Sequence, residues 1–219
     1  MKKIIIIGTS GSSIDILDTI QDINRIAPQY ECLGFLDDNA AQHGKEFLGC
    51  KVLGAIHLAK DYPEAYFING IGSTRTFLKK AAILQNTGIP LDKFETIVHP
   101  TASVSRSAKL GLGTVIFQNV TITTNVTIGN HVIILPNSVI SHDDVIGDYT
   151  CIAGGVCISG GVRIGGSCYI GTNSSFIENI VVGNNCLIGM GSTVLKDVEA
   201  NSVMAGSPAR IIRKTTDVS

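Results

Sequence analysis

Residues 121–158 read TITTNVTIGNHVIILPNSVISHDDVIGDYTCIAGGVCI, and an aliphatic residue returns in this segment at every sixth position. The same register continues from Val98 to Val194, where 16 of the 17 positions are Val, Leu or Ile and the other is Phe176. An α-helix repeats every 3.6 residues and a strand every two, so neither accounts for a period of six. The register therefore predicts a repeat architecture over about a hundred residues.

A six-residue repeat predicts a triangular solenoid, in which each hexad forms one side and three hexads form one coil of about 18 residues. The repeated aliphatic side chain points inward, and the residue four positions later is small, as at Ala102, Ser138 and Cys168. Gly and Asn stand at the corners, where positive φ is needed. The flat sides and open ends of such a prism favour association, so we expect a homotrimer about an axis parallel to the prisms.

The N-terminal part of the chain has a different pattern, in which continuous apolar runs alternate with amphipathic periods. This alternation is typical of a small α/β unit with a parallel sheet. We predict strands at residues 4–7, 32–36, 66–71 and 94–98, and helices at residues 14–23 and 74–85. The chain is thus expected to divide into a Rossmann-like domain at residues 1–94 and a β-helix domain with a C-terminal tail at residues 95–219.

The composition agrees with this organisation. The chain of 219 residues has 24 Gly, no Trp and 5% aromatic residues, as expected for an aliphatic core with tight corners. Its 17 Lys plus Arg and 18 Asp plus Glu give a net charge of −1, which argues against nucleic acid or an anionic membrane as a partner. The six Cys include no C-x-x-C pair, and no signal sequence opens the chain, so we expect a cytoplasmic protein with reduced thiols.

One hexad carries the best candidate for catalysis. His142 occupies its outward third position, and a step of 18 residues places Thr124 below it and Gly160 above it. Because glycine has no side chain, the space beside the imidazole is open. Asp143 and Asp144 follow directly, and a carboxylate that fixes the imidazole tautomer is what a general base needs. An isolated surface histidine is more often an ordinary solvated side chain, and the two carboxylates argue against that alternative here.

Asp144 occupies the inward fifth position of the same hexad, with Val126 and Val162 at the equivalent positions of the adjacent coils. An uncompensated carboxylate is costly in an apolar interior. Asp144 is therefore either tied to backbone N–H groups or supports the His142 site from beneath.

Three histidines, His99, His131 and His142, raise the question of a metal site. The separation of 11 residues between His131 and His142 is neither close to 18 nor a multiple of six, so stacking of coils within one chain does not bring them together. We expect no metal.

Six segments spread over nearly the whole chain carry a resemblance to a known family. They are IIIIGTSGSS at 4–13, FLDD at 35–38, NGIGSTRTFLKK at 69–80, IVHPTASVS at 97–105, SHDDVIGDYTCIAGGV at 141–156 and VMAGSPAR at 203–210. Together they resemble the sialic-acid O-acetyltransferase-type family of acyltransferases, which includes N-acetyltransferases acting on UDP-linked 4-amino sugars in bacillosamine synthesis and on GDP-perosamine. The resemblance implies a Rossmann-like α/β domain followed by an all-β left-handed parallel β-helix of hexapeptide repeats.

The resemblance also implies a reaction, in which acetyl passes directly from acetyl-CoA to the amino group of a nucleotide-linked amino sugar of the UDP-4-amino-4,6-dideoxy type, for surface glycan or glycoprotein biosynthesis. His142 would be the general base, and Asp143 would raise its basicity. The residues implied for acetyl-CoA, in a groove between two subunits, are Cys151, Gly160, Thr172, Met190, Pro208 and Arg210. The residues implied for the nucleotide-sugar are Ser10, Gly11, Ser12, Asp37, Asp38 and Gly72.

Two alternative functions stay open at this point. One is O-acetylation of sialic acid or a related sugar, because a hydroxyl acceptor needs the same base. The other is a non-catalytic nucleotide-binding scaffold, against which His142 and its carboxylates argue. The sequence does not decide which sugar or which nucleotide (UDP, GDP or TDP) is bound, nor whether Asp143 or Asp144 orients His142. Relatives often have histidine where this chain has Ser12 and Cys151.

Overall fold

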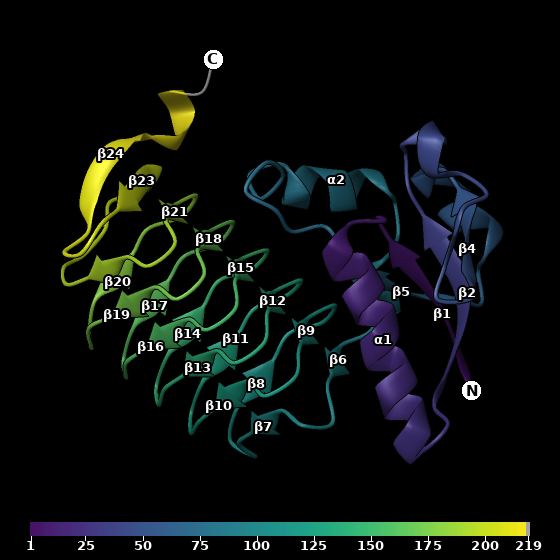
Figure 1. Cartoon of the computed structure of the whole chain (residues 1–219), viewed down its shortest axis with the longest axis horizontal. Coiled ribbons are helices and arrows are strands. Elements are labelled where there is room, and N and C mark those ends of the chain that lie inside the picture. The colour runs from purple at the N-terminus through teal and green to yellow at the C-terminus, as the bar shows by residue number, and fades with distance from the viewer. Residues whose placement is uncertain (218–219) are drawn as a thin grey trace.

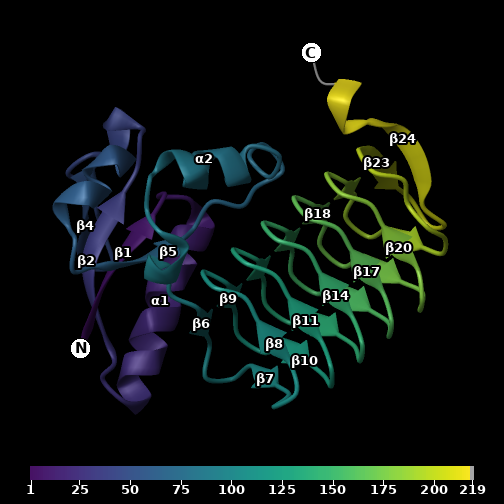
Figure 2. The same cartoon turned by 180° about the vertical axis from the view of Figure 1, so that it is seen from behind.

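The computed structural model describes residues 1–217 and consists of an α/β domain followed by a prism of short strands (Figure 1). Figure 2 shows the same arrangement from behind, with the N-terminal domain beside the first coils of the prism and the C-terminal strands at its far end. Both parts of the predicted fold class are confirmed. Within residues 1–217, no helix has the length and apolar character needed to cross a membrane.

The N-terminal sheet has five strands in the order β3-β4-β2-β1-β5. Four of them are parallel, and β3 pairs antiparallel with β4. Helix α1 (Gly11–Ile26) buries Ile16, Leu17 and Ile20 against Ile4, Ile6 and Phe35 of the sheet, as its three- and four-residue spacing requires. The strands are β1 (Lys2–Ile7), β2 (Tyr30–Leu36), β3 (Glu46–Phe47), β4 (Cys50–Gly54) and β5 (Tyr66–Asn69).

The helix predicted at residues 74–85 is wrong in its first half. Residues 74–79 form turns, and α2 is confined to Lys80–Asn86. The backbone bonds explain the difference: the Thr76 and Lys79 amides donate to the carbonyl groups three residues earlier, at 3.0 and 2.8 Å, so the segment closes as turns instead of a continuous α-helix. Residues 1–217 also contain four short 3₁₀ helices, η1 (Ala40–Gln42), η2 (Ile56–Asp61), η3 (Leu91–Lys93) and η4 (Thr215–Asp217).

The strands predicted at residues 66–71 and 94–98 are both shorter in the structure. β5 ends at Asn69, whose Oδ1 accepts the Ile71 amide at 2.8 Å and turns the chain. Phe94 forms an isolated parallel bridge with Phe67, and the next strand, β6, begins at Ile97. The domain boundary between residues 94 and 95 therefore falls close to the point where the chain leaves the N-terminal sheet, and it stays a prediction.

From β6 to β22 the chain winds through three parallel faces, and the strands of successive coils pair 18 residues apart, as Thr121 does with Val139. At the C-terminal end, β21 pairs with β23, where Leu187 lies opposite Val203. The first face contains β6 (Ile97–Val98), β9 (Val115–Ile116), β12 (Ile133–Ile134), β15 (Cys151–Ile152), β18 (Tyr169–Ile170), β21 (Leu187–Ile188), β23 (Ser202–Ala205) and the antiparallel β24 (Arg210–Lys214). The second face contains β7 (Ser103–Val104), β10 (Thr121–Ile122), β13 (Val139–Ile140), β16 (Cys157–Ile158), β19 (Ser175–Phe176) and β22 (Thr193–Val194). The third face contains β8 (Lys109–Leu110), β11 (Thr127–Ile128), β14 (Val145–Ile146), β17 (Arg163–Ile164) and β20 (Val181–Val182).

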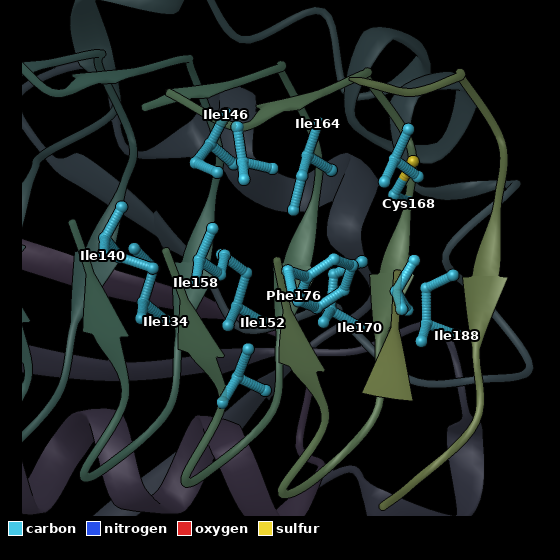
Figure 3. Close-up of a cluster of buried hydrophobic side chains, with 14 of the residues drawn as sticks. Ile134, Ile140, Ile146, Ile152, Ile158, Ile164, Cys168, Ile170, Phe176 and Ile188 are labelled. Carbon is cyan, nitrogen blue, oxygen red and sulfur yellow. The ribbon is translucent and has the colours of Figure 1, made fainter. Parts of the chain in front are cut away.

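The sixth-position residues form the core of the prism. Figure 3 shows Ile134, Ile152 and Ile170 of the first face pointing toward the isoleucines of the other faces. The positions from Ile116 to Val194 in this register are all at most 2% exposed. The fourth residue of the hexad adopts positive φ at most corners, where Asn is frequent, as at Asn125 (59°) and Asn173 (57°). The hexad prediction is confirmed in both respects.

The three faces differ in what covers their outer surface. On the first face, Ile133, Cys151 and Tyr169 pack against the N-terminal domain in one shared cluster, so this face is buried. Figure 1 shows the N-terminal domain lying against this side of the prism. On the third face, the outward residues include Lys109 and Arg163, both exposed. The outward residues of the second face are small and uncharged: Ser103, Thr121, Val139, Cys157, Ser175 and Thr193.

Candidate active site

His142 lies on the corner between the second and third faces, in the turn from β13 to β14. Its side chain is 64% exposed, and its Nδ1 lies 2.8 Å from Asp143 Oδ2. Asn125 Nδ2 donates to the other Asp143 oxygen at 3.2 Å. The hydrogen bond with His142 lowers the pKa of the Asp143 carboxyl, and the bond from Asn125 lowers it further. The Asp143 carboxylate is thus held from both sides, and it leaves Nε2 of His142 directed away from it.

Gly160 lies against the imidazole of His142, as the step of 18 residues predicts. A Cβ built on Gly160 would lie 2.5 Å from Cε1 and 2.6 Å from Nε2 of His142. No side chain larger than hydrogen fits there without moving the ring. The glycine at position 160 therefore leaves space for the imidazole. We call the corner that holds residues 142, 160, 178 and 196 the His142 corner.

Asp144 is fully buried beneath this corner, and its Oδ1 accepts the Val162 amide at 2.7 Å. Of the two alternatives inferred from the sequence, the structure thus shows the bond to a backbone N–H group. Within residues 1–217, Oδ2 has no hydrogen-bond partner. Burial raises the pKa of the Asp144 carboxyl to about 7, although the Val162 and Ser141 amides oppose the shift. The hydrogen-bond partner of His142 Nδ1 is Asp143, the residue directly before Asp144.

The residues predicted for the nucleotide-sugar lie where β1, β2 and β5 end. Ser10 Oγ donates to the Gly70 carbonyl at 3.2 Å, which brings the turn after β1 against the turn after β5. Thr9 Oγ1 donates to Asp37 Oδ2 at 2.6 Å, which joins the ends of β1 and β2. Gly11 and Ser12 open the first turn of α1, and the capping position Ser10 forms no side-chain cap. The backbone N–H groups of Gly11 and Ser12, at the N-terminus of α1, suit an anion such as phosphate.

Two members of the nucleotide-sugar set have other contacts in the structure. Asp38 Oδ1 accepts the Ile56 amide at 2.9 Å, so this carboxylate caps η2. Gly72, in the turn after β5, lies against the first face of the prism, where a built Cβ would be 2.5 Å from Cys151 Sγ. Gly72 is therefore required for the contact between the two domains.

The residues predicted for acetyl-CoA separate into two groups. Thr172 and Met190 are exposed on the corner between the first and second faces, which holds residues 154, 172 and 190 and which we call the Thr172 corner. They line a cleft of about 290 Å³ together with Thr74 and Tyr169. Pro208 and Arg210 line a separate groove of about 540 Å³ with Lys196, at the C-terminal end of the His142 corner. One chain does not bring the two groups together.

The burial of Cys151 contradicts the prediction that this residue contacts the cofactor. Its side chain is only 2% exposed, and its Sγ lies 3.5 Å from the carbonyl oxygen of Gly72. Burial raises the pKa of its thiol. The physical reason is that Cys151 is an outward residue of the first face, which the N-terminal domain covers, so the thiol belongs to the domain contact.

The three histidines of the β-helix domain lie in different surroundings. His99 Nε2 is 3.0 Å from Asp22 Oδ2, and the His131 ring stacks on Tyr149 with centroids 5.3 Å apart. His142 bonds to Asp143. Among residues 1–217, no three His, Cys, Asp or Glu side chains are grouped in a way that would hold a metal ion.

The structure adds Asn125, Thr9 and Lys80 to the residues expected from the sequence. Asn125 anchors Asp143, and a step of 18 residues back from Asp143 identifies it. Thr9 anchors Asp37, which no periodicity indicates. Lys80 is fully buried near the domain contact, and within residues 1–217 its Nζ has no hydrogen-bond partner. Burial lowers the pKa of this ammonium to about 8.

The two domains and the corner site define a hexapeptide-repeat β-helix protein with a Rossmann-like N-terminal domain. Residues 3–81 match the family described as the PglD N-terminal domain, and residues 161–196 match the bacterial transferase hexapeptide family of six repeats. These matches confirm the resemblance drawn from the sequence motifs.

Similar proteins agree with this assignment. UDP-N-acetylbacillosamine N-acetyltransferase of Bacillus subtilis (strain 168) is 30% identical over 118 residues, which are 53% of this chain and 51% of that protein. The match thus spans about half the length of this curated relative.

Solved structures extend the similarity over the whole fold. A histidine-to-asparagine mutant of perosamine N-acetyltransferase from Caulobacter crescentus has a TM-score of 0.85 at 22% identity and covers 98% of each chain. The acetyltransferase domain of PglB from Neisseria gonorrhoeae FA1090 has a TM-score of 0.84 at 24% identity, over 97% of this chain and 100% of that one. These similarities establish the left-handed β-helix and the order of the two domains.

Proposed function

We propose that the protein transfers acetyl from acetyl-CoA to the amino group of a nucleotide-linked amino sugar of the UDP-4-amino-4,6-dideoxy type, for surface glycan or glycoprotein biosynthesis. The observation that carries the proposal is the exposed His142, held by Asp143 and seated against Gly160. Relatives support it: the Bacillus protein is named an N-acetyltransferase of UDP-N-acetylbacillosamine, and structures of the Caulobacter and Neisseria proteins contain CoA with GDP-perosamine and acetyl-CoA, respectively.

The proposed reaction is a direct transfer. The neutral amine of the sugar attacks the thioester carbonyl carbon, and His142 Nε2 takes a proton from the nitrogen as the C–N bond forms. The tetrahedral intermediate then collapses, the C–S bond breaks, and the imidazolium returns the proton to the departing CoA sulfur. Asp143 accepts a hydrogen bond from Nδ1 throughout and stabilises the imidazolium. No covalent enzyme intermediate forms.

The site is incomplete in a single chain. The nucleotide-sugar residues lie with the N-terminal domain beside the first face, whereas His142 lies on the corner between the other two faces. Thr172 and Met190, on the Thr172 corner, are likewise separated from Gly160 by the width of the second face. A second copy that places its His142 corner beside the Thr172 corner unites these residues.

The surface of the prism supports a homotrimer with the second face nearest the three-fold axis. The N-terminal domain covers the first face, and the third face carries charges, whereas the small residues of the second face permit close approach. Apolar side chains are exposed on both flanking corners, with Met190 80% exposed on one and Ile177 and Leu195 exposed on the other. Rotation by 120° about this axis brings unlike corners together and forms three equivalent sites.

A complementation experiment tests the shared site. His142→Ala and Asp37→Ala chains, each inactive alone, are dissociated, mixed in equal amounts and reassociated. If the base and the sugar site come from different copies, random mixing restores about a quarter of the wild-type activity, because one site in four receives both intact halves. No recovery, or a monomer mass by light scattering at micromolar concentration, would contradict the proposal.

The function itself is tested with acetyl-CoA, a thiol reporter and a panel of UDP-, GDP- and TDP-linked amino sugars. His142→Ala should lower turnover by about 10²- to 10⁴-fold and leave the affinity for acetyl-CoA nearly unchanged, since the base acts in the transition state. Unchanged turnover would exclude His142 as the base. Sialic acid in the same panel tests O-acetylation, and release of no thiol with any acceptor would favour a binding scaffold.

We further propose that the protein works in the cytoplasm. All six cysteines are free, and reduced thiols persist in a reducing compartment.

A further inference from the structure

A second groove, of about 580 Å³, lies between the turn that precedes α2 and the C-terminal segment of the chain. One wall is the turn that precedes α2, with Thr74, Arg75 and Lys79, and the other is the C-terminal segment, with Arg213 and Thr215. Figures 1 and 2 show this turn and the β23–β24 hairpin facing each other beyond β18 and β21. Two segments more than a hundred residues apart in sequence thus build one groove.

The groove is strongly cationic. Arg75, Lys79 and Arg213 line it, and no carboxylate is among its lining residues within the described part of the chain. None of the ion pairs within residues 1–217 uses these three side chains, whereas the neighbouring Lys214 is bound to Glu199 at 3.0 Å. In a chain with a net charge of −1, three cations that line one groove and form no ion pair within residues 1–217 fit a phosphate-bearing ligand.

The groove adjoins the cleft on the Thr172 corner, because Thr74 and Leu187 line both. A ligand long enough to pass these two shared residues connects the cleft with the groove. A ligand of this kind is long, with a neutral arm in the cleft and phosphates in the groove. Leu78 and Val203 add apolar surface on which a purine ring can lie.

We propose that Arg75, Lys79 and Arg213 bind the phosphates of the 3′-phospho-ADP portion of acetyl-CoA. This inference rests on the proposed function, because it assigns the nucleotide end of the same co-substrate. It makes the N-terminal domain a direct contributor to cofactor binding, in addition to its role with the nucleotide-sugar. The phosphates of the nucleotide-sugar are the other source of the same chemistry, and the experiment separates the two.

The experiment measures binding to the full chain by calorimetry with three probes: CoA, 3′-dephospho-CoA and UDP. Arg75→Ala and Arg213→Ala should each weaken CoA binding by about 10- to 100-fold, which is the usual effect of a charge-assisted hydrogen bond to phosphate. Wild-type protein should bind CoA more tightly than 3′-dephospho-CoA, and the double variant should lose most of this preference. Its CoA affinity should also depend less on salt.

Arg163→Ala is the matched control, because Arg163 is an exposed arginine of the third face outside the groove. Its CoA affinity should stay within about twofold of wild type. Arg75 and Arg213 are exposed, so their removal leaves the core intact, and thermal unfolding verifies this. Unchanged CoA affinity in the triple alanine variant would overturn the assignment, as would a loss of UDP affinity alone. Wild-type protein that fails to bind CoA would overturn the proposed function together with it.

Discussion

Replacement of Gly160 by alanine tests the site with the smallest possible change. The built Cβ would lie 2.5 Å from Cε1, 2.6 Å from Nε2 and 2.9 Å from Nδ1 of His142. Gly160 does not have positive φ, so alanine is compatible with the backbone there. The clash falls on a ring that is largely exposed, and the ring moves away while the fold remains.

The size of the displacement follows from the contact distances. To reach an ordinary van der Waals separation of 3.4 Å, the ring must move by at least about 0.9 Å, which breaks its alignment with Asp143. A misplacement of about 1 Å at a reacting group costs about 10²-fold in rate. We therefore expect turnover of Gly160→Ala to fall by about 100-fold, with a free energy of unfolding within about 1 kcal/mol of wild type.

The assay is steady-state thiol release from acetyl-CoA with the acceptor found in the panel, alongside urea unfolding. Gly166→Ala is the matched control, because its built Cβ approaches the Asp148 carbonyl oxygen at 3.1 Å and Gly166 lies between β17 and β18, away from both corners of the proposed site. Its turnover should stay within about threefold of wild type. Wild-type turnover in Gly160→Ala would show that catalysis does not need the imidazole in the position it has in the structure.

Three further substitutions have distinct expected outcomes. Asp143→Asn should lower turnover by about 10-fold, less than His142→Ala, because the amide keeps the geometry and loses the charge that stabilises the imidazolium; kcat values check the order. Burial raises the pKa of Asp144 from 3.8 to about 7, so the folded state holds a proton that the unfolded chain releases. The contribution of this group to stability is full below about pH 4 and is lost as the pH rises through 7, by at most about 4 kcal/mol. Asp144→Asn should flatten this pH dependence in urea unfolding at pH 4–8. Burial lowers the pKa of Lys80 from 10.5 to about 8, so the free energy of unfolding should rise between pH 8 and pH 10.5, by at most about 3 kcal/mol. Lys80→Met should abolish this rise and increase the melting temperature at pH 7.

The prism could be predicted from the sequence because its periodicity is a local property. Every inward residue lies at the same place in its hexad, and each coil contacts only its neighbours, so arithmetic with 6 and 18 gives both the core and pairs such as His142 with Gly160. The same arithmetic leads to Asn125. The first half of the second predicted helix failed because the Thr76 and Lys79 amides bond three residues back, as in turns, and apolar spacing does not report that difference.

The contact between the two domains could not be predicted in the same way. Cys151 and Tyr169 are outward residues in the hexad register, and nothing in that register shows that Gly72 and Phe77 of another domain cover them. Such contacts join segments that are close only after both domains fold. The assignment of Cys151 to the cofactor failed for this reason.

Asp144 shows how the repeat itself resolves an ambiguity that the sequence left open. Thr114, Ser138 and Thr150 occupy the same fifth position of their hexads, and each accepts the backbone N–H of the residue 18 positions later through its side-chain oxygen. Asp144 makes the same bond to Val162, at 2.7 Å.

The carboxylate is thus one member of a set of bonds that hold successive coils in register. Its bond joins the coil that carries His142 to the coil that carries Gly160. Loss of Asp144 should therefore change the pH dependence of stability much more than turnover, whereas loss of Asp143 should do the reverse. A variant of Asp144 that keeps its stability and loses its turnover would show that the inward carboxylate acts on His142 after all.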